Sequence, residues 1–468
     1  MHEDLFAGVT ATVSTGVVGA AKSIGEAAEK IGKVSDGYSA ANAGFSGLKA
    51  IDGASNLQNM ASGKGNIASA SVGVGFEFSK SKEKSESSTP VVTEIRGGNN
   101  VSIEAKSGDI NSHGSEITAG YDKYGRPSGG SGDITLKAGN DVNLQSAQAT
   151  NSSSSSSTAA GASVGVSAGV SLTGNGTGAN ASAHGGVNKS KGDGTTQVNT
   201  HVEGSGDIKI ESGRDTNIKG GVVSGETITA DVGRDLNIVS EADIGKSSNE
   251  SASMGISANL SNPAITSVSP GYGQGSGETN WIEEQSGLIS KGKMDVTVEG
   301  NTHLGAGKII SENGDLTLDT GTLTHEDFSG SKKYEGFDVN ANIDLSGKDA
   351  DGNKQQQPGQ TTLPSTTAEG KYQLDDTRQE VRSTVGPGNI IIRDKDKQAE
   401  LEASGQTAAL DDLNRDPNKA YEITKDQHVD IDFYLSDTSV QKACEHDTEH
   451  ASRYGGCSHQ RRLAKCGN

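Results

Sequence analysis

Short runs in which apolar and polar residues alternate recur along the middle of the chain. Residues 207–218 read DIKIESGRDTNI and residues 227–238 read TITADVGRDLNI, so the second run repeats the first at an offset of 20 residues without a gap. Ile208 and Ile210 alternate with polar residues, a period of two that predicts strands with one buried face. Further members are residues 133–144, a looser pair that places Val296 over Leu316 and Val298 over Leu318, and weaker runs from Val101 and Ile390.

A GRD or GND triplet separates the two halves of each run. Glycine adopts positive φ without steric cost, so we expect a turn with positive φ at Gly213 and Gly233 and a strand on each side. A period of about 20 residues is too short for two helices and fits one turn of a β-solenoid. Equivalent residues then stack between turns, with isoleucine on isoleucine inside and Asn217 on Asn237 at a corner. The predicted fold class is all-β, a parallel β-helix with about 20 residues per turn.

Four longer alternating segments lie between the repeats. They have the length and the two-residue period of transmembrane β-strands. The simpler interpretation is that they are strands or hairpins that project from the solenoid or cover its sides. The second hypothesis is that they insert into the outer membrane of a target cell. The segments are Ser71–Phe78, Ala162–Leu172, Ser253–Leu260 and Phe337–Leu345.

Two regions depart from the β pattern. From Gly19, the sequence GAAKSIGEAAEKIGKV places Ala, Ile and Val three and four residues apart, which predicts one or two helices that cap the solenoid. A second helix is predicted near Gln398–Leu413. We therefore divide the chain into a weakly helical segment (1–65), a repeat solenoid with Ser- and Gly-rich protrusions (66–330), a terminal repeat portion with a linker (331–438) and a basic tail (439–468).

The composition favours a solenoid or disorder over large globular cores. Only 31% of the residues are apolar and 4% aromatic, and there are 65 glycines. A solenoid interior can be filled by stacked small and β-branched side chains, and the regular period favours it over disorder. The net charge of −20 argues against a nucleic-acid partner, because phosphate binding needs clustered Lys and Arg.

The chain carries no sign of a membrane-spanning helix or a signal peptide. No apolar run reaches the roughly 18 residues that such a helix requires. The start, Met1-His2-Glu3-Asp4, is acidic where a secretory signal is basic. If the protein acts outside the cell, we expect its export signal to lie on sequence that this chain does not contain.

The repeats resemble the haemagglutinin repeats of filamentous-haemagglutinin-like and CdiA-type exoproteins, which two-partner systems secrete. The resemblance is strong over Ser71–Asp327 and continues weakly to Leu435, and it is to the toxin-proximal repeat region of those proteins. Neither the amino-terminal secretion domain of the family nor its VENN-like motif is present in this sequence. The runs that carry the resemblance are GSGDITLKAGNDVNLQSAQAT from Gly130, VSGETITADVGRDLNIVSEAD from Val223, EEQSGLISKGKMDVTVEGNTHLGAGKIIS from Glu283 and DTGTLTHED from Asp319.

The resemblance implies a non-enzymatic region of a large secreted exoprotein on the bacterial surface. Such a region would contact a target cell and deliver a C-terminal toxin in contact-dependent growth inhibition. The implied partners are a receptor or the outer membrane of the target cell, an outer-membrane transporter for the full-length parent, and an immunity protein if a toxin domain follows. Two alternatives are a plain adhesin without toxin delivery and a β-helical enzyme that acts on polysaccharides. The enzyme would need paired carboxylates and aromatic platforms, whereas the chain has one tryptophan, Trp281.

The tail is the only region where thiol and imidazole side chains cluster. Its spacing, C-x-H-x3-H-x6-C-x-H-x6-C, fits no standard zinc finger, so we assign no metal, cofactor or catalytic residue. The tail is interpreted as an unstructured junction to a toxin module, a small zinc or disulfide knot, or a remnant of an effector. The zinc candidates are Cys444, His446, His450, Cys457, His459 and Cys466.

One further stretch resembles a calcium site. Residues 349–353 read DADGN, like the start of an EF-hand loop. Lys354 stands where the loop needs Gly, and Gln360 stands where it needs Glu. The stretch therefore predicts a solvated turn.

Overall fold

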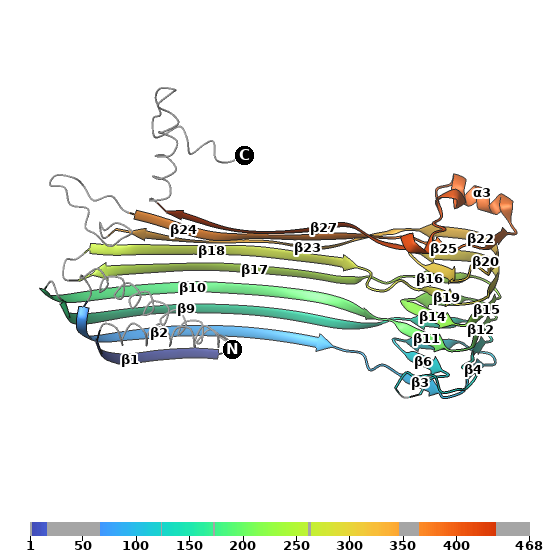
Figure 1. Ribbon diagram of the computed structural model, residues 1–468, viewed down its shortest axis with the longest axis horizontal. Coiled ribbons are helices and arrows are strands. Elements are labelled where there is room, and N and C mark those ends of the chain that lie inside the picture. Colours follow the sequence, from blue (N-terminus) through green and yellow to red (C-terminus); the bar gives the residue numbers. More distant parts are fainter. Residues whose placement is uncertain are drawn as a thin grey trace, which may run out of the picture.

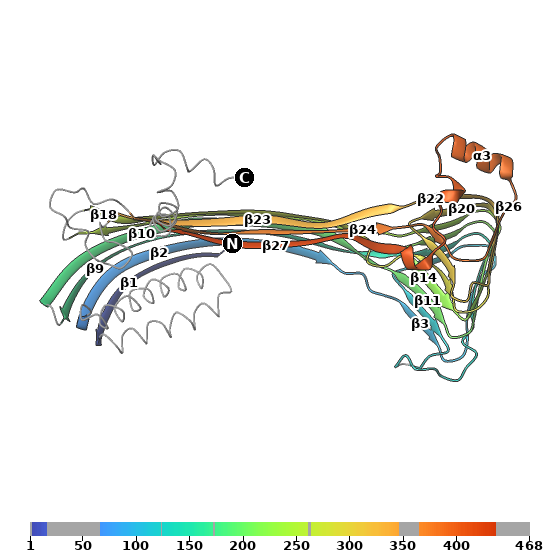
Figure 2. The same cartoon turned by 45° about the horizontal axis from the view of Figure 1, so that its top comes forward.

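The computed structural model describes residues 2–15, 66–122, 124–171, 174–260, 264–345 and 365–436. A solenoid of short parallel strands lies at one end of the molecule, and a long antiparallel sheet extends from it (Figures 1 and 2). The predicted all-β class with a parallel β-helix is confirmed. In the described part of the chain, no helix is long and apolar enough to cross a membrane.

Each coil of the solenoid consists of three short strands. The first two belong to an 11-stranded sheet and the third to a 7-stranded sheet. The first strands are β4 (Val101–Ala105), β7 (Ile134–Ala138), β12 (Asp207–Ser212), β15 (Thr227–Val232), β20 (Met294–Gly305), β22 (Leu316–Glu326) and β26 (Asn389–Ile392). The second strands are β5 (Ile110–His113), β8 (Val142–Gln145), β13 (Thr216–Lys219), β16 (Leu236–Val239) and the later halves of β20 and β22. The third strands are β3 (Glu94–Gly97), β6 (Glu116–Ala119), β11 (Thr200–Gly204), β14 (Gly221–Gly225), β19 (Gly287–Ser290), β21 (Lys308–Ser311) and β25 (Thr384–Val385).

The core of the solenoid is a set of stacked aliphatic columns. Ile208 pairs with Ile134 of one neighbouring coil and with Ile228 of the other, and all three side chains are buried. The offset of 20 residues between Ile208 and Ile228 is therefore confirmed. Because side chains alternate along a strand, the neighbours of Ile208 on β12, Asp207 and Lys209, face solvent.

The looser pair was predicted in the wrong register. Val296 pairs with Leu318 rather than with Leu316, an offset of 22 residues. The two extra residues lie in one turn. Gly225 and Ile228, which are three residues apart, align with Ser311 and Leu316, which are five apart.

The predicted positive φ at Gly213 and Gly233 is wrong. Neither residue is among the glycines with positive φ. Glycine is required there because successive coils approach closely: a Cβ on Gly233 would lie 2.4 Å from the carbonyl oxygen of Gly213. The left-handed conformation occurs instead at Gly220 (φ +69), at the next corner of the coil.

The long sheet has nine antiparallel strands that follow one another in chain order. The four alternating segments lie in or overlap four of these strands, so the simpler interpretation, strands that project from the solenoid, is confirmed. The strands are β1 (His2–Thr15), β2 (Asn66–Ser88), β9 (Ala147–Ser171), β10 (Gly174–Val198), β17 (Asp243–Asn259), β18 (Ala264–Trp281), β23 (Phe328–Asp344), β24 (Ser365–Val381) and β27 (Tyr421–Ser436).

The hairpins leave the solenoid once in every two coils. β9–β10, β17–β18 and β23–β24 each follow a second strand and precede a third strand, whereas the coils between them carry no hairpin. Two stacked coils rise by about 10 Å, which is also the width of two hydrogen-bonded strands. Each hairpin therefore lies within hydrogen-bonding distance of the next, and one continuous sheet results.

The N-terminal segment contains a strand that was not predicted. Within residues 1–65, expected to be weakly helical, His2–Thr15 forms β1 and pairs with β2. Leu5, Ala7 and Val9 occupy alternate positions, a period of two that is typical of a strand. The predicted helices from Gly19 lie outside the described residues.

A helix closes the last coil of the solenoid. The helix predicted near Gln398–Leu413 is present in part, as α3 (Lys395–Ala403), followed by the short 3₁₀ helix η1 (Leu410–Asp412). Gln398 of α3 is buried, and its side-chain amide accepts from the backbone N–H of Leu323 (2.8 Å) and donates to the Leu323 carbonyl (2.9 Å). The amide thus replaces a neighbouring strand at an edge that would otherwise be unpaired.

Replacing Gln398 with Leu should destabilise this edge. The change leaves the backbone N–H and C=O of Leu323 buried without partners, at a cost of about 1–3 kcal/mol. We expect faster hydrogen exchange at the Leu323 amide in Gln398→Leu. Lys397→Leu, at an exposed position of the same helix, is the control. Equal exchange in the two variants would show that Gln398 does not protect the edge.

Candidate interaction surface

The half of the long sheet that lies away from the solenoid, here called the far half, has one apolar face and one polar face. Residues directly opposite each other in an antiparallel sheet share a face, so Phe76, Ala162, Ala183 and Ile256 form one row across four strands. We call this side the apolar face. Its large exposed side chains are Val74, Phe76, Val164, Val166, Val187, Met254, Ile256, Tyr272, Phe337, Ile431, Phe433 and Leu435.

The opposite face is built from small and polar residues. Gly75 pairs with Ser163 and Gly271 with Asn340, in rows that alternate with those of the apolar face. On the apolar face itself, the rings of Tyr272 and Phe337 lie 5.8 Å apart. The sheet is therefore amphipathic although it is a single layer (Figure 2).

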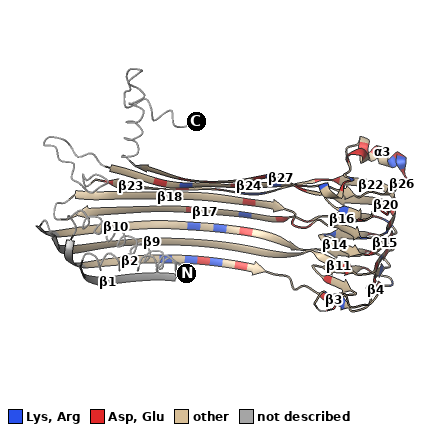
Figure 3. Cartoon of the chain, viewed as in Figure 1, with Lys and Arg blue, Asp and Glu red and all other residues tan. Residues whose placement is uncertain are grey.

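Charged residues on the apolar side lie nearer the solenoid. Lys80, Lys82 and Lys84 of β2, and Lys189 and Lys191 of β10, lie in the halves of their strands that run toward the coils (Figure 3). The rows through Phe76 and Phe78 contain no charged side chain among the described residues. The far half of the face therefore offers uncharged, flat contact area.

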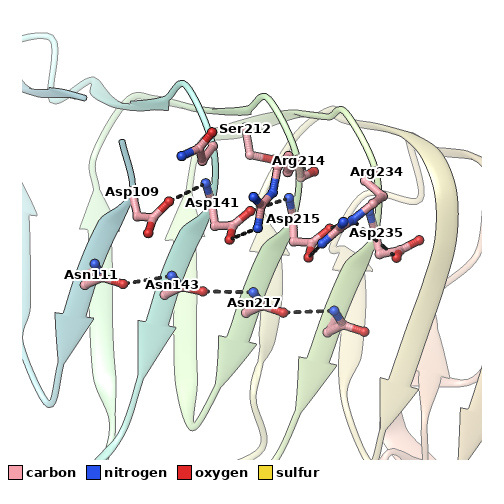
Figure 4. A network of polar contacts seen from close by, with 12 residues as sticks. Asp109, Asn111, Asp141, Asn143, Ser212, Arg214, Asp215, Asn217, Arg234 and Asp235 are labelled. Carbon is pink, nitrogen blue, oxygen red and sulfur yellow. Dashed lines mark hydrogen bonds and ion pairs between the residues drawn. The ribbon is translucent and has the colours of Figure 1, made fainter. Parts of the chain in front are cut away.

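A ladder of asparagines runs across the second strands of the coils, β5, β8, β13 and β16 (Figure 4). Asn143 donates to Asn111 (2.8 Å), Asn217 to Asn143 (2.8 Å) and Asn237 to Asn217 (2.9 Å). The predicted stacking of Asn217 on Asn237 is confirmed, but both residues lie within strands and not at a corner. The side-chain amide of each asparagine forms a hydrogen bond with the equivalent amide of the next coil. These bonds fix the register in which the coils stack.

A second ladder of aspartates and arginines lies beside the asparagines (Figure 4). Arg214 pairs with Asp141 (2.9 Å), and Arg234 pairs with Asp215, each reaching back to the preceding coil. The hydrogen bonds from Arg234 lower the pKa of Asp215. The GRD triplet therefore supplies a close-packing glycine together with an ion pair between coils.

A small second core lies where the sheet joins the solenoid. Ile282, Ala306 and Val381 are buried there against Phe328. Trp281 is only 4% exposed, and the ammonium group of Lys332 lies 4.7 Å from the centroid of its ring. The single tryptophan thus packs at the junction and offers no platform for a sugar.

A histidine and a glutamate also meet at this junction. His201 Nε2 lies 2.9 Å from Glu284 Oε2, and Asn199 donates to the same carboxylate oxygen (3.0 Å). The hydrogen bond between them raises the pKa of His201 and lowers that of Glu284. The pair was not predicted, because hairpin β17–β18 separates the two residues in the sequence and only the fold brings them together.

No cluster of potential metal ligands occurs in the described ranges. The six candidate zinc ligands of the tail and the calcium-like stretch 349–353 lie outside those ranges. In the described part of the chain, the candidate functional regions are therefore the amphipathic sheet and its junction with the coils.

Comparison with known proteins agrees with this architecture. Residues 74–252 match the hemagglutinin repeat family. The chain is 29% identical over 426 residues to a tRNA nuclease CdiA of Escherichia coli (strain NC101), covering 88% of this chain and 12% of that protein. It is 28% identical over 403 residues to a deoxyribonuclease CdiA of Yersinia pseudotuberculosis serotype O:3 (strain YPIII), covering 82% of this chain and 34% of that protein. The chain carries a CdiA-type haemagglutinin-repeat region.

A third relative has the higher identity of 32% over 344 residues. It is a 16S rRNA endonuclease CdiA of Enterobacter cloacae subsp. cloacae, and the alignment covers 72% of this chain and 10% of that protein. The chain thus spans about a tenth of the length of the Escherichia and Enterobacter relatives. No solved structure matches the chain.

The His201–Glu284 pair should make the stability of the haemagglutinin-repeat region depend on pH. The contribution of His201 is present below its unfolded pKa of about 6.5 and is lost as pH rises through its raised folded pKa. The contribution of Glu284 is present above its unfolded pKa of about 4.3 and is lost as pH falls through its lowered folded pKa. The pair is therefore fully formed near pH 5–6. Because both side chains are partly exposed, its loss should cost at most about 1 kcal/mol.

Thermal unfolding at pH 5.5 and pH 8.5 tests this expectation. The unmodified chain should lose more stability between the two pH values than His201→Gln does. His113→Gln, at an exposed position of β5, should behave like the unmodified chain. Identical pH dependence in all three proteins would show that the pair contributes nothing.

Proposed function

We propose that this chain is a non-enzymatic scaffold of a secreted CdiA-type exoprotein that contacts a target cell and helps deliver a C-terminal toxin. The partner at the target is a surface receptor or the outer membrane. An outer-membrane transporter would secrete the full-length parent, and an immunity protein would accompany it if a toxin domain follows. The relatives are named as nucleases and toxins, which supports delivery over simple adhesion.

The observation that carries this proposal is the long sheet that stands out from the solenoid. Its far half is uncharged and exposed on the apolar face, which suits contact with another surface. β27 runs away from the coils and ends at Ser436, at the far end of the sheet (Figure 1). Ser436 therefore lies beside the same exposed half.

Binding of the labelled chain to target bacteria tests the contact. At nanomolar concentration, Val164→Ser/Val166→Ser, which removes two exposed apolar side chains of β9, should weaken binding at least about tenfold, which corresponds to about 1.4 kcal/mol. Lys189→Ser/Lys191→Ser, in the charged half of β10, is the matched control. Binding to lipid vesicles as well would assign the outer membrane as the target, and binding to cells alone would assign a receptor.

Two results would contradict the proposal. One is the absence of any binding by the unmodified chain, and the other is equal binding by the two variants. Delivery is tested separately in the full-length parent, where the Val164→Ser/Val166→Ser variant should no longer inhibit the growth of target cells. Binding without growth inhibition by the unmodified parent would instead assign a plain adhesin.

A further inference from the structure

The apolar face is too large to remain bare in a soluble protein. The eight strands from β2 to β27, about 4.8 Å apart, and the length of Ala341–Leu345, about 3.3 Å per residue, outline about 600 Å² in the rows that hold no charged residue. Soluble monomers rarely expose a contiguous apolar patch of more than a few hundred Å². Val74, Met254 and Leu435, which lie far apart on this face, are each more than half exposed. The described part of the chain does not cover the face.

We propose that a second copy of this chain covers the apolar face, so that two long sheets stack face to face in a two-fold dimer. The two copies point in opposite directions and overlap only on their far halves, with both solenoids outside the overlap. This is the packing of a β-sandwich, in which apolar faces meet about 10 Å apart. The proposal rests on the sheet. The dimer uses the same face that the proposed function assigns to the target, so the two copies must separate before that face can contact a target cell.

The size and flatness of the face fit a second copy. A standard protein interface buries about 800 Å² on each partner, and the outlined face supplies most of that area. A two-fold dimer uses the same patch on both partners, so the patch must be complementary to itself. The flat face of a single sheet meets this condition, because the rows of side chains on one copy can pack between the rows of side chains on the other.

The distribution of charge determines how the copies overlap. The chain has a net charge of −20, so two copies repel each other in general. The rows through Phe76 and Phe78 hold no described charged residue and can meet without burying a charge. Copies that pointed in the same direction and overlapped fully would also bury Lys82 and Lys189 of the half near the solenoid. Opposed copies leave these lysines in water.

Sedimentation of the full 468-residue chain tests the dimer. The unmodified chain should have twice the monomer mass of 47.8 kDa at micromolar concentration. Met254→Lys, which places a lysine on the apolar face of β17, should weaken dimerisation at least tenfold. Ser253→Lys, at the adjacent exposed position on the opposite face, should leave the dissociation constant within about twofold. Circular dichroism checks that both variants keep the β structure.

Leu435→Lys on the edge strand β27, in the same row as Met254, serves as a second variant if Met254→Lys does not fold. A monomer at every concentration would overturn the proposal, and so would a dimer that Met254→Lys and Leu435→Lys leave intact. A monomer that binds lipid vesicles would assign the face to a lipid surface instead and would also overturn it. None of these readouts involves a target cell, so failure of the dimer and failure of the proposed function are distinguishable.

Discussion

Ile218→Ala is expected to lower the free energy of unfolding by about 2–5 kcal/mol. Ile218 lies on β13 between Leu144 and Ile238 of the neighbouring coils, and all three side chains are fully buried. Truncation leaves a cavity that both neighbouring coils line. The stability of a solenoid is approximately a sum of terms between adjacent repeats, so a cavity in a middle coil weakens two interfaces at once.

Unfolding in guanidinium chloride, followed by circular dichroism, measures this effect. Lys219→Ala changes the next residue of the same strand, which is exposed, and should cost less than about 0.5 kcal/mol. If Ile218→Ala lowered the free energy of unfolding by less than about 1 kcal/mol, the stacked core would be contradicted. So small an effect is typical of a side chain in a shallow or mobile site.

Removal of hairpin β17–β18 is expected to divide the long sheet in two. With residues 243–281 replaced by a short linker, β10 and β23 would remain three strand spacings apart, about 14 Å, too far for hydrogen bonds. The solenoid coils on either side should persist, because their pairing does not involve the hairpin. β10 and β23 would each become an edge strand that opens more easily.

Limited trypsin digestion measures the opening of these strands. Cleavage after Lys191 and Lys333, which lie on β10 and β23, should accelerate at least about tenfold. Deletion of residues 121–131, which link β6 to β7 outside the long sheet, is the control and should leave cleavage unchanged. If the hairpin deletion also left cleavage at both sites unchanged, the hairpins would be independent of one another.

The solenoid was predictable because its signal is local and repeated. Ile208 and Ile228 stand at equivalent places in two adjacent runs of 12 residues, and the shared asparagine predicts the ladder of amides. The role of Gly213 was not predictable from turn chemistry alone. It depends on how closely two coils approach, which is a property of the stack and not of one turn.

The continuous sheet was not predicted, although four of its nine strands were. Each alternating segment indicates a strand with two different faces, but not which strand lies beside it. Pairing of Val187 with Ala252 follows only when two hairpins leave the solenoid two coils apart. The same holds for His201 and Glu284. They follow two different hairpins, β9–β10 and β17–β18, and they meet only when the coils stack.

The most direct test of this account is hydrogen–deuterium exchange of the unmodified chain over β9, β10, β17 and β18. The account predicts that the central amides of all four strands are protected at least about a hundredfold relative to an unfolded chain. The protection should span the pairs between hairpins, such as Val187 with Ala252, as well as those within each hairpin. Unprotected exchange throughout these strands, with β12–β16 still protected, would contradict the continuous sheet and leave only the solenoid.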